Sequence, residues 1–429
     1  MVSRRCTPLT FLLTGFAWLL VSSLLGIATL VGLVNGTPLP KWLRTIHVHG
    51  ALVGGLLQVV IGGFLVSFDH ASAHKKSHSP SRSALFLILN GATFALLVSL
   101  WLSQLTLAGV AGLVLVGTVA SLAKNAWRHV QEELNVPVGA GWLYRTALAA
   151  LLIGLGTGVA MAFRLVPEYY AHARLLHLHL IIMGCFTVTL LVATHQLLPT
   201  LSQRELANPR LTHFALGFVP LGLAALIAGF VTSSLRMELA VGFFLVIAIS
   251  LCAFNLFNTW IRSGSTGNAA SDHLLIGVFF LLLAAVTGLG MGANNLPTPS
   301  LLPIGSLHLV AYTHLAFIGF MVHVICGGLS YAIPVLLARS RVPNPKKREL
   351  YREQLETIMN RWRAIQLGAM SFGTVGLAAL ASLTWSLPLG SPYVQSAVWL
   401  AAGLLVGSLA LFTAKLGWAV GLQPVTQTS

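Results

Sequence analysis

The sequence predicts an all-α integral membrane protein with twelve transmembrane helices in three pseudo-repeated four-helix arcs. Hydrophobic residues make up 56% of the 429 residues and charged residues only 8%, and the mean hydropathy is +0.84. Apolar runs of about 20 residues, long enough to cross a hydrocarbon core of about 30 Å, recur along the chain. A helix beginning with histidine also recurs three times. We therefore expect residues 1–429 to form a single membrane domain.

The apolar runs begin near the N-terminus and leave few residues for a soluble domain. The first run is too long for a removable signal peptide and lacks its small-residue cleavage site, so we expect it to be the first span. The predicted spans are 9–34, 46–67, 84–103, 106–124, 144–163, 174–198, 212–231, 239–260, 273–293, 307–337, 364–385 and 395–417.

Basic residues are divided unevenly between the two sides of this topology. Twenty of the 25 lysines and arginines, Lys415 and the eight between Arg339 and Arg363 among them, fall on the side that holds both termini. The positive-inside rule therefore predicts cytoplasmic termini in a bacterial inner membrane. Topology and contact with membrane lipids explain the net charge of +15, so nucleic acid is not an expected partner. The basic segment from Arg339 to Arg363 is expected to form a helix at the membrane surface.

Three predicted spans, the second, sixth and tenth, begin with a histidine followed five residues later by a glycine. The spacings between these histidines are 130 and 135 residues, which indicates a repeat of four helices with units of about 1–140, 141–272 and 273–429. A histidine inside a membrane is costly and indicates function, so three at matching depth predict metal binding. The pairs are His49 with Gly54, His179 with Gly184, and His314 with Gly319.

A second histidine precedes the first two of these by two residues: His47 and His177, with Tyr312 in the same place in the tenth span. Residues two apart on a helix point about 200° from each other and do not easily bind one metal. Imidazole is a good ligand for haem iron and for copper. Arg44 and Arg174 lie five residues before His49 and His179, where they can pair with haem propionates or simply mark a helix end.

On these residues the chain resembles subunit I of the haem–copper oxidase superfamily, which has twelve spans in three arcs. His49-Gly50 followed by Gly62-Gly63-Phe64 is similar to the second-helix signature. His314, followed by Gly319-Phe320, Gly327, Tyr331 and Pro334, resembles the tenth helix of C-type oxidases and nitric oxide reductases. The resemblance implies a low-spin haem b ligated by His49 and His314, with His47 as a substitute for His49. It implies respiratory electron transfer from a partner subunit, a cytochrome c or a quinol, and leaves reduction of oxygen or nitric oxide open.

The chain also departs from that family. Tyr312 replaces the tenth-helix histidine that holds the high-spin haem, and it can act as a tyrosinate ligand or as a hydrogen-bonding group. The family binds copper through one histidine of the sixth helix and two of the seventh, whereas this chain has His177 and His179 on the sixth and only His213 on the seventh. We expect a metal site, copper foremost, at these three residues. The binuclear centre is incomplete, so enzymatic activity stays open.

Two alternatives remain. His47, His49, Gly54 and Gly63-Phe64-Leu65 are also similar to the NnrS family of twelve-span haem and copper proteins linked to nitric oxide stress. That resemblance implies a non-catalytic protein that senses, stores or protects. The other alternative is a transporter whose intramembrane histidines carry protons or metal ions. The near absence of carboxylates from the spans counts against a proton-driven pump.

Overall fold

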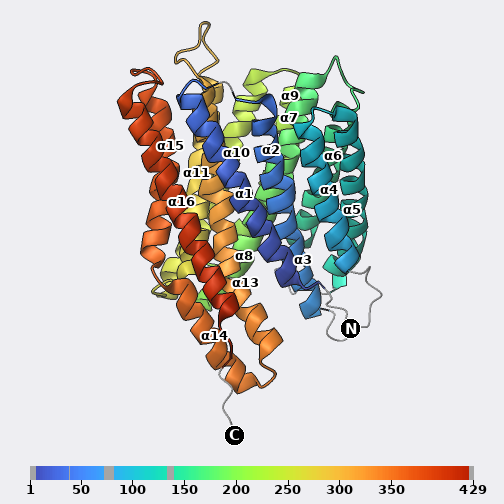
Figure 1. Cartoon of the computed structure of the whole chain (residues 1–429), viewed down its shortest axis with the longest axis vertical. Helices are drawn as coiled ribbons and strands as arrows, with labels where there is room; N and C mark the ends of the chain where they lie inside the picture. The colour runs from blue at the N-terminus through green and yellow to red at the C-terminus, as the bar shows by residue number, and fades with distance from the viewer. Residues whose placement is uncertain (1–5, 38, 72–81, 133–139, 425–429) are drawn as a thin grey trace. The chain divides into compact units, whose positions relative to one another are not determined.

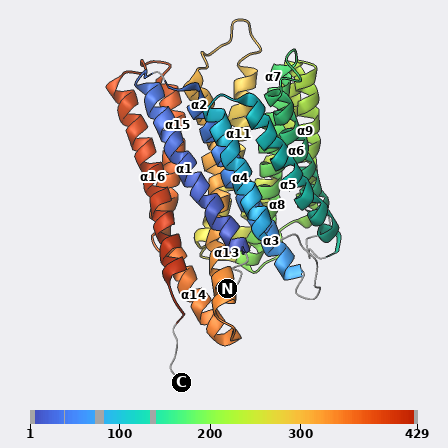
Figure 2. The ribbon, with the colours of Figure 1, turned by 45° about the vertical axis from the view of Figure 1, so that its right-hand side comes forward.

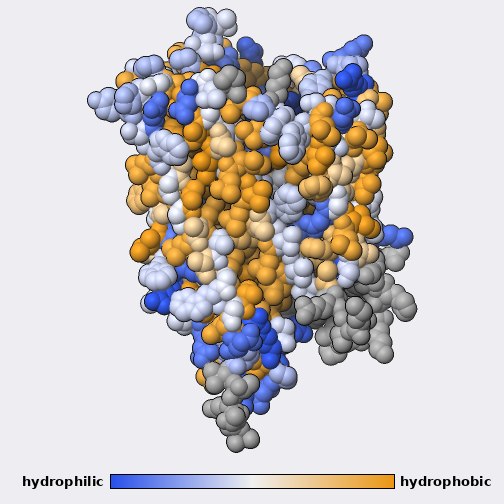
Figure 3. Space-filling model, in the orientation of Figure 1, coloured by the Kyte–Doolittle hydropathy of each residue, from blue (hydrophilic) through white to orange (hydrophobic). Residues whose placement is uncertain are grey.

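The computed structural model describes residues 6–37, 39–71, 82–132 and 140–424, and this part of the chain contains helices and no strand. Twelve of the helices found there are long and apolar enough to cross a membrane, which confirms the predicted all-α class and the twelve spans. Figure 1 shows them coloured along the chain. On the face drawn in Figure 3, hydrophobic side chains cover the middle of the helices and hydrophilic ones gather toward the helix ends.

The first five spans follow the predicted order. They are α1 (Pro8–Val34), a second span built from α2 (Lys41–His49), η1 (Gly50–Leu57) and α3 (Gln58–Ala71), then α4 (Arg82–Trp101), α5 (Leu105–Glu132) and α6 (Ala140–Ala162). The sixth to eighth are a span built from α7 (Tyr170–His179), η3 (Leu180–Thr187) and α8 (Val188–Ser202), then α9 (Pro209–Val231) and α10 (Leu235–Ser263).

The remaining spans are α11 (Ala269–Ala293), a tenth span built from α12 (Ser306–His314), η4 (Leu315–Val322) and α13 (His323–Arg341), then α15 (Arg363–Leu383) and α16 (Pro392–Gly421). Between the tenth and eleventh spans lies α14 (Pro345–Asn360), the basic helix expected from the sequence. It packs against α13 and the end of α16 in both views of Figures 1 and 2.

Three spans are not continuous α-helices. The second, sixth and tenth each contain an eight-residue π-helix, η1, η3 or η4. In a π-helix, each backbone N–H bonds to the carbonyl five residues earlier instead of four. Such helices hold well under 1% of residues in soluble proteins and are frequent at functional sites. Their presence in these three spans points to the same helices as the histidine pattern.

Packing divides the chain into two compact units, which are described separately. Unit 1 contains residues 1–33, 37–193 and 213–248, and unit 2 contains residues 34–36, 194–212 and 249–429. Unit 1 therefore holds the pair of α1 with the second span and the pair of α6 with the sixth span up to Ala193. Unit 2 holds the pair of α11 with the tenth span.

Two helices of unit 2 begin at asparagines whose side chains cap the first helical turn. At the start of α11, Asn268 and Ser271 form a capping box in which each side chain accepts the backbone N–H of the other. At the start of α14, the Asn344 side chain accepts the N–H groups of Lys346 and Lys347, and Pro345 occupies the first helical position. Both starts follow from the sequence alone.

The basic residues used for the topology include one that is not a surface charge. Lys415 is 2% exposed and lies within unit 2 rather than at its surface. The charge count overestimates its contribution to topology, because a cation bonded inside the protein no longer reports which side of the membrane it faces. Four other residues in that count, Arg4, Arg5, Lys75 and Lys76, lie outside the described residues.

Candidate metal-binding histidines

The three repeated histidines occupy the same position relative to the π-helices. Each is the last residue of an α-helix, and the π-helix begins at the next residue: His49 before η1, His179 before η3, and His314 before η4. The sequence contained a signal that could have predicted this feature. The glycine that follows each histidine by five residues lies inside the π-helix, and five residues is the hydrogen-bond spacing of that helix.

Each repeated histidine donates its Nδ1 proton to a backbone carbonyl of its own helix. The acceptor is four residues earlier in every case, at 2.9, 2.8 and 2.7 Å: Thr45 for His49, Leu175 for His179, and Val310 for His314. A carbonyl can only accept, so Nδ1 carries the proton of the neutral ring and Nε2 carries the lone pair. This is the tautomer in which an imidazole binds a metal through Nε2.

The first histidine of each H-x-H pair is held by the preceding span instead. His47 donates from Nδ1 to the Ser22 carbonyl of α1 at 2.6 Å, and His177 donates from Nδ1 to the Gly154 carbonyl of α6 at 2.8 Å. Four residues after each carbonyl, a glycine makes room for the ring. A Cβ on Gly26 would lie 2.6 Å from the His47 ring, and one on Gly158 would lie 2.7 Å from the His177 ring. Both imidazoles therefore also keep Nε2 as the lone-pair nitrogen.

Tyr312 takes the corresponding place in unit 2. A Cβ on Gly288 of α11 would lie 2.8 Å from the Tyr312 ring, so a glycine again accommodates an aromatic side chain from the second helix of the pair. The tyrosine fills the pocket but does not offer an imidazole nitrogen. Unit 2 thus has the backbone arrangement of the H-x-H pair with a single histidine, His314.

The glycines inside the π-helices share one packing role. Each lies against the facing side chain of the preceding span, so closely that an added Cβ would approach it to 2.6–2.7 Å: Gly54 against Trp18, Gly184 against Ala150, and Gly319 against Phe280. Glycine is required here because only a residue without a side chain lets the two helices approach this far. The same glycine contact therefore recurs at equivalent positions in the three helix pairs.

Within unit 1, the structure brings one histidine of the second span close to one of the sixth. The rings of His49 and His177 have centroids 6.4 Å apart and planes 25° from parallel. With metal–nitrogen bonds of about 2.0–2.1 Å, two imidazoles on opposite sides of one metal ion have centroids about 6 Å apart. The separation of these two ring centroids is close to that value.

The three-histidine site predicted at His177, His179 and His213 is not assembled. His177 faces α6, whereas His179 packs on Phe230 of α9 with ring centroids 4.5 Å apart. His213 is exposed and lies 17 residues before Phe230 on α9, or about 25 Å along the helix. Consistent with this, the described residues contain no group of three or more histidine, cysteine or acidic side chains that could hold a metal ion. His213 lies near the start of α9 and Phe230 near its end.

The two arginines proposed to pair with haem propionates are surface residues. Arg44 of α2 and Arg174 of α7 are both exposed, one turn or more before the histidines of their spans. Neither forms an ion pair within the described part of the chain. Their positions are compatible with a ligand carboxylate and equally with an ordinary helix end.

Unit 2 contains a polar cluster that sequence reasoning missed. His273 of α11 and His323, the first residue of α13, approach each other with Nδ1 atoms 2.9 Å apart, and Nε2 of His273 lies 3.0 Å from the Gln366 amide nitrogen. Lys415 donates to Oε1 of the same glutamine at 2.6 Å. The four side chains are 0–2% exposed. They come from four different helices with no shared spacing, so the sequence gives no signal that they meet.

No protein-family model matches this sequence, and a search of curated proteins finds no relative. The functional assignment therefore rests on the chemistry of the residues themselves.

Proposed function

We propose that this protein is a membrane redox protein that holds haem or copper through the Nε2 atoms of its repeated histidines. The observation that carries the proposal is the hydrogen bonding of Nδ1. The four histidines of the two H-x-H pairs and His314 of the tenth span each donate Nδ1–H to a backbone carbonyl. Histidines that bind metals are held in this way in metalloproteins, because the bond fixes both the tautomer and the ring orientation.

The histidine imidazoles are suitable ligands for haem iron or copper. Neutral imidazole is a ligand for both haem iron and copper, and a haem held between two imidazoles carries one electron without covalent chemistry. The π-helices add rigidity to the ligands, since each histidine sits at a junction fixed by a glycine contact on the preceding span. A histidine that served packing alone would have no reason to recur at this junction three times.

Two pairings of histidine ligands are consistent with these contacts and can be distinguished by mutation. The resemblance to the haem–copper oxidases implies haem on His49 and His314, which belong to units 1 and 2 respectively, with copper near His177 and His179. The ring separation in unit 1 favours His49 and His177 as ligands of one metal ion. We propose electron transfer as the function in either case, with the electron donor a partner subunit, a cytochrome c or a quinol.

The test is a reduced-minus-oxidised spectrum of the detergent-purified protein with haem and copper quantified. We expect a six-coordinate b-type haem that does not react with carbon monoxide, lost in His49→Ala. Loss in His314→Ala with retention in His177→Ala supports the oxidase-like pairing, and the reverse supports the pairing within unit 1. His172→Ala is the matched control, because His172 lies on α7 with His177 but bonds to Ser233 at the surface.

Two outcomes would change the assignment. Binding of carbon monoxide to the wild type reveals an open iron position and converts the proposal into one of gas reduction. Wild-type protein that contains neither haem nor copper after expression with both supplied overturns the proposal and favours the transporter alternative.

A further inference from the structure

We propose that Lys415, Gln366, His273 and His323 form a proton-binding site of unit 2, in which the proton on Lys415 sets whether His323 Nε2 offers a proton or a lone pair. The site is separate from the metal-binding histidines proposed above and does not depend on them. Its four side chains come from α16, α15, α11 and α13. Burial of such groups inside a membrane protein is costly, so a connected set of four indicates a function.

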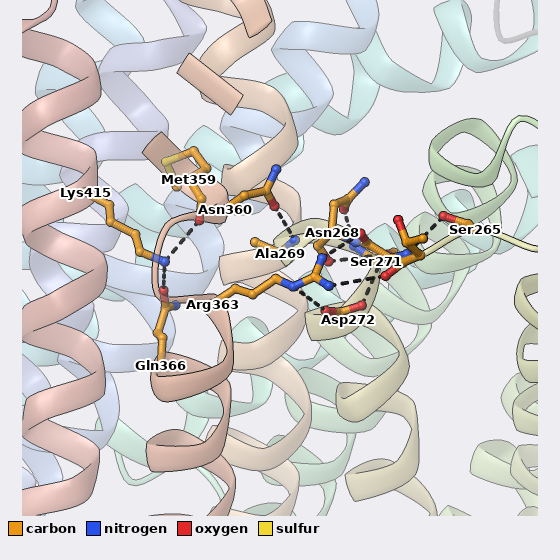
Figure 4. Close-up of polar contacts among 12 residues, drawn as sticks. Ser265, Asn268, Ala269, Ser271, Asp272, Met359, Asn360, Arg363, Gln366 and Lys415 are labelled. Carbon is orange, nitrogen blue, oxygen red and sulfur yellow. Dashed lines mark hydrogen bonds and ion pairs between the residues drawn. The ribbon is translucent and has the colours of Figure 1, made fainter. Parts of the chain in front are cut away.

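The direction of every hydrogen bond follows from the ammonium group at one end. An ammonium can only donate, so Lys415 donates to the carbonyl of Met359 at 3.0 Å and to Oε1 of Gln366 at 2.6 Å. Figure 4 shows Lys415 reaching both groups at the junction of α14 and α15. With Oε1 occupied in this way, the amide nitrogen of Gln366 must face His273, and it donates to Nε2 of that ring at 3.0 Å.

The donors and acceptors of His273 and His323 follow in the same way. His273 accepts at Nε2, so its proton is on Nδ1, and it donates to Nδ1 of His323 at 2.9 Å. His323 accepts at Nδ1 and therefore carries its own proton on Nε2. That nitrogen is fully buried and has no hydrogen-bond partner among the described residues. The ring stacks on Phe280, with planes 26° apart. A buried N–H without a protein partner calls for an acceptor of another kind, for which an internal water is the simplest chemistry.

Loss of one proton from Lys415 allows a second arrangement, in which the three links from Lys415 through Gln366 and His273 to His323 are reversed while Lys415 still donates to the Met359 carbonyl. A neutral amine has a lone pair, so the Gln366 amide can rotate and donate to it from nitrogen. Oε1 then accepts from His273 Nε2–H, His273 Nδ1 accepts from His323 Nδ1–H, and His323 Nε2 presents a lone pair. The site releases one proton to water, and each imidazole keeps one proton on its other ring nitrogen. Both arrangements satisfy all the links, whereas mixed arrangements place two donors or two acceptors face to face.

Other charged groups near the site do not replace Lys415 in this role. On α11, Asp272 faces Arg363 of α15 at 3.6 Å, and Arg363 also donates to the Gly267 carbonyl at 2.5 Å (Figure 4). Asp272 and Arg363 thus form an ion pair with each other at the starts of α11 and α15. Cys326 of α13 is a buried free thiol within electrostatic range of Lys415, and Arg361 lies over the rings of Trp362 and Trp418. Among the described residues, Lys415 is the cation that bonds to Gln366 and, through it, to the two histidines.

The test uses Gln366→Glu, a change of nearly equal shape that leaves only acceptors at this position. A carboxylate accepts from Lys415 and from His273 Nε2–H, so it forces the second arrangement while Lys415 stays charged. The measurement is magnetic resonance of the full-length protein in lipid with isotope-labelled histidine, which distinguishes Nδ1–H from Nε2–H rings. We expect two of the 15 histidines to change tautomer in opposite directions.

The control is Ser408→Ala, because Ser408 donates to the backbone carbonyl of Gln366 and does not touch its side chain. This variant is expected to leave all histidine tautomers unchanged. In the wild type, raising the pH until Lys415 loses its proton should produce the same two opposite changes as Gln366→Glu. Lys415→Met should abolish that response to pH. A Gln366→Glu spectrum identical to the wild type, or a wild-type pH series without the paired change, overturns the proposal.

Discussion

The tenth span of unit 2 and the second span of unit 1 share one backbone plan but differ at the residue where the π-helix ends. That residue is Gln58 in the second span and His323 in the tenth. On the preceding span, the corresponding position lies seven residues before the side chain that meets the π-helix glycine. This position is Phe11 in α1 and His273 in α11. Gln58 is fully buried with neither side-chain polar atom bonded among the described residues, whereas His323 bonds to His273.

The sixth span supplies a third version of the same position. There the π-helix ends at Val188, and the corresponding residue of α6 is Leu143, so both positions hold buried apolar side chains. The comparison teaches that glycine contacts fix how the two helices of each pair approach. A few side chains at equivalent positions then decide whether the interior is apolar, carries an isolated amide, or forms a connected polar chain.

The largest expected effect tests whether glycine fixes the shared plan. Gly319→Leu forces a side chain into the ring of Phe280, and we expect it to lower the free energy of unfolding by about 3 kcal/mol, since overpacking of a tight interior is poorly relieved. Thermal unfolding of the detergent-purified protein measures this. Gly328→Leu in the same span is the control, because nothing lies within 4 Å of an added Cβ there. Equal loss of stability in both variants would contradict the role assigned to Gly319.

The second prediction compares a buried, hydrogen-bonded glutamine of unit 2 with a buried glutamine of unit 1. Gln366→Leu removes one hydrogen bond from Lys415 and one from His273. We expect a loss of about 2 kcal/mol in unfolding free energy, because the two buried groups keep only their bonds to Met359 and His323. Gln58→Leu removes a buried amide that has no bond to lose, so it should be neutral or stabilising by about 1 kcal/mol. Unfolding of the two variants side by side measures the contrast. Destabilisation by Gln58→Leu as large as by Gln366→Leu would show that Gln58 has a partner, such as a bound group.

A smaller effect concerns the positioning of the metal-binding histidines. Gly158→Ala places a methyl group 2.7 Å from the His177 ring and must displace it, which we expect to lower metal affinity about 10-fold, as do changes to the groups that hold a ligand. Gly156→Ala, two residues away on α6 with nothing within 4 Å, is the matched control. Metal titration of the purified apoprotein provides the measurement. Unchanged affinity in Gly158→Ala would remove His177 from the set of ligands.

The smallest expected effect on stability is that of Tyr312→His, which gives unit 2 the H-x-H pair of unit 1. The imidazole should occupy the place beside Gly288 and donate Nδ1–H to the Ala284 carbonyl, the counterpart of Ser22 and Gly154, at a cost of less than about 1 kcal/mol. We expect the variant to bind additional haem or copper relative to the wild type. Metal and haem content per protein tests this, and an unchanged content would show that the tenth span needs more than a second imidazole.

The sequence by itself determined the helical class, the twelve spans and the three helices that carry the repeated histidines. These depend on apolar run length and on one-dimensional spacing, which the chain records directly. The glycine five residues after each histidine was recognised as part of the repeat, whereas the π-helices that contain these glycines emerge only from the structure. One-dimensional spacing does not record how far along its helix a side chain lies relative to those on neighbouring helices. His213 was therefore grouped with His179, although it lies about 25 Å along α9 from Phe230, on which His179 packs.

Only the tertiary structure decided which polar groups meet. His49 and His177 are neighbours within unit 1, and no spacing in the sequence predicts a ring separation of 6.4 Å. Lys415, Gln366, His273 and His323 are connected through four helices up to 142 residues apart, from His273 to Lys415. In the sequence, a lysine near the end of a span is interpreted as a topology signal, but packing buries Lys415 inside unit 2. Burial then turns it into the charge that orients a chain of hydrogen bonds, because in a low-dielectric interior each donor must find an acceptor.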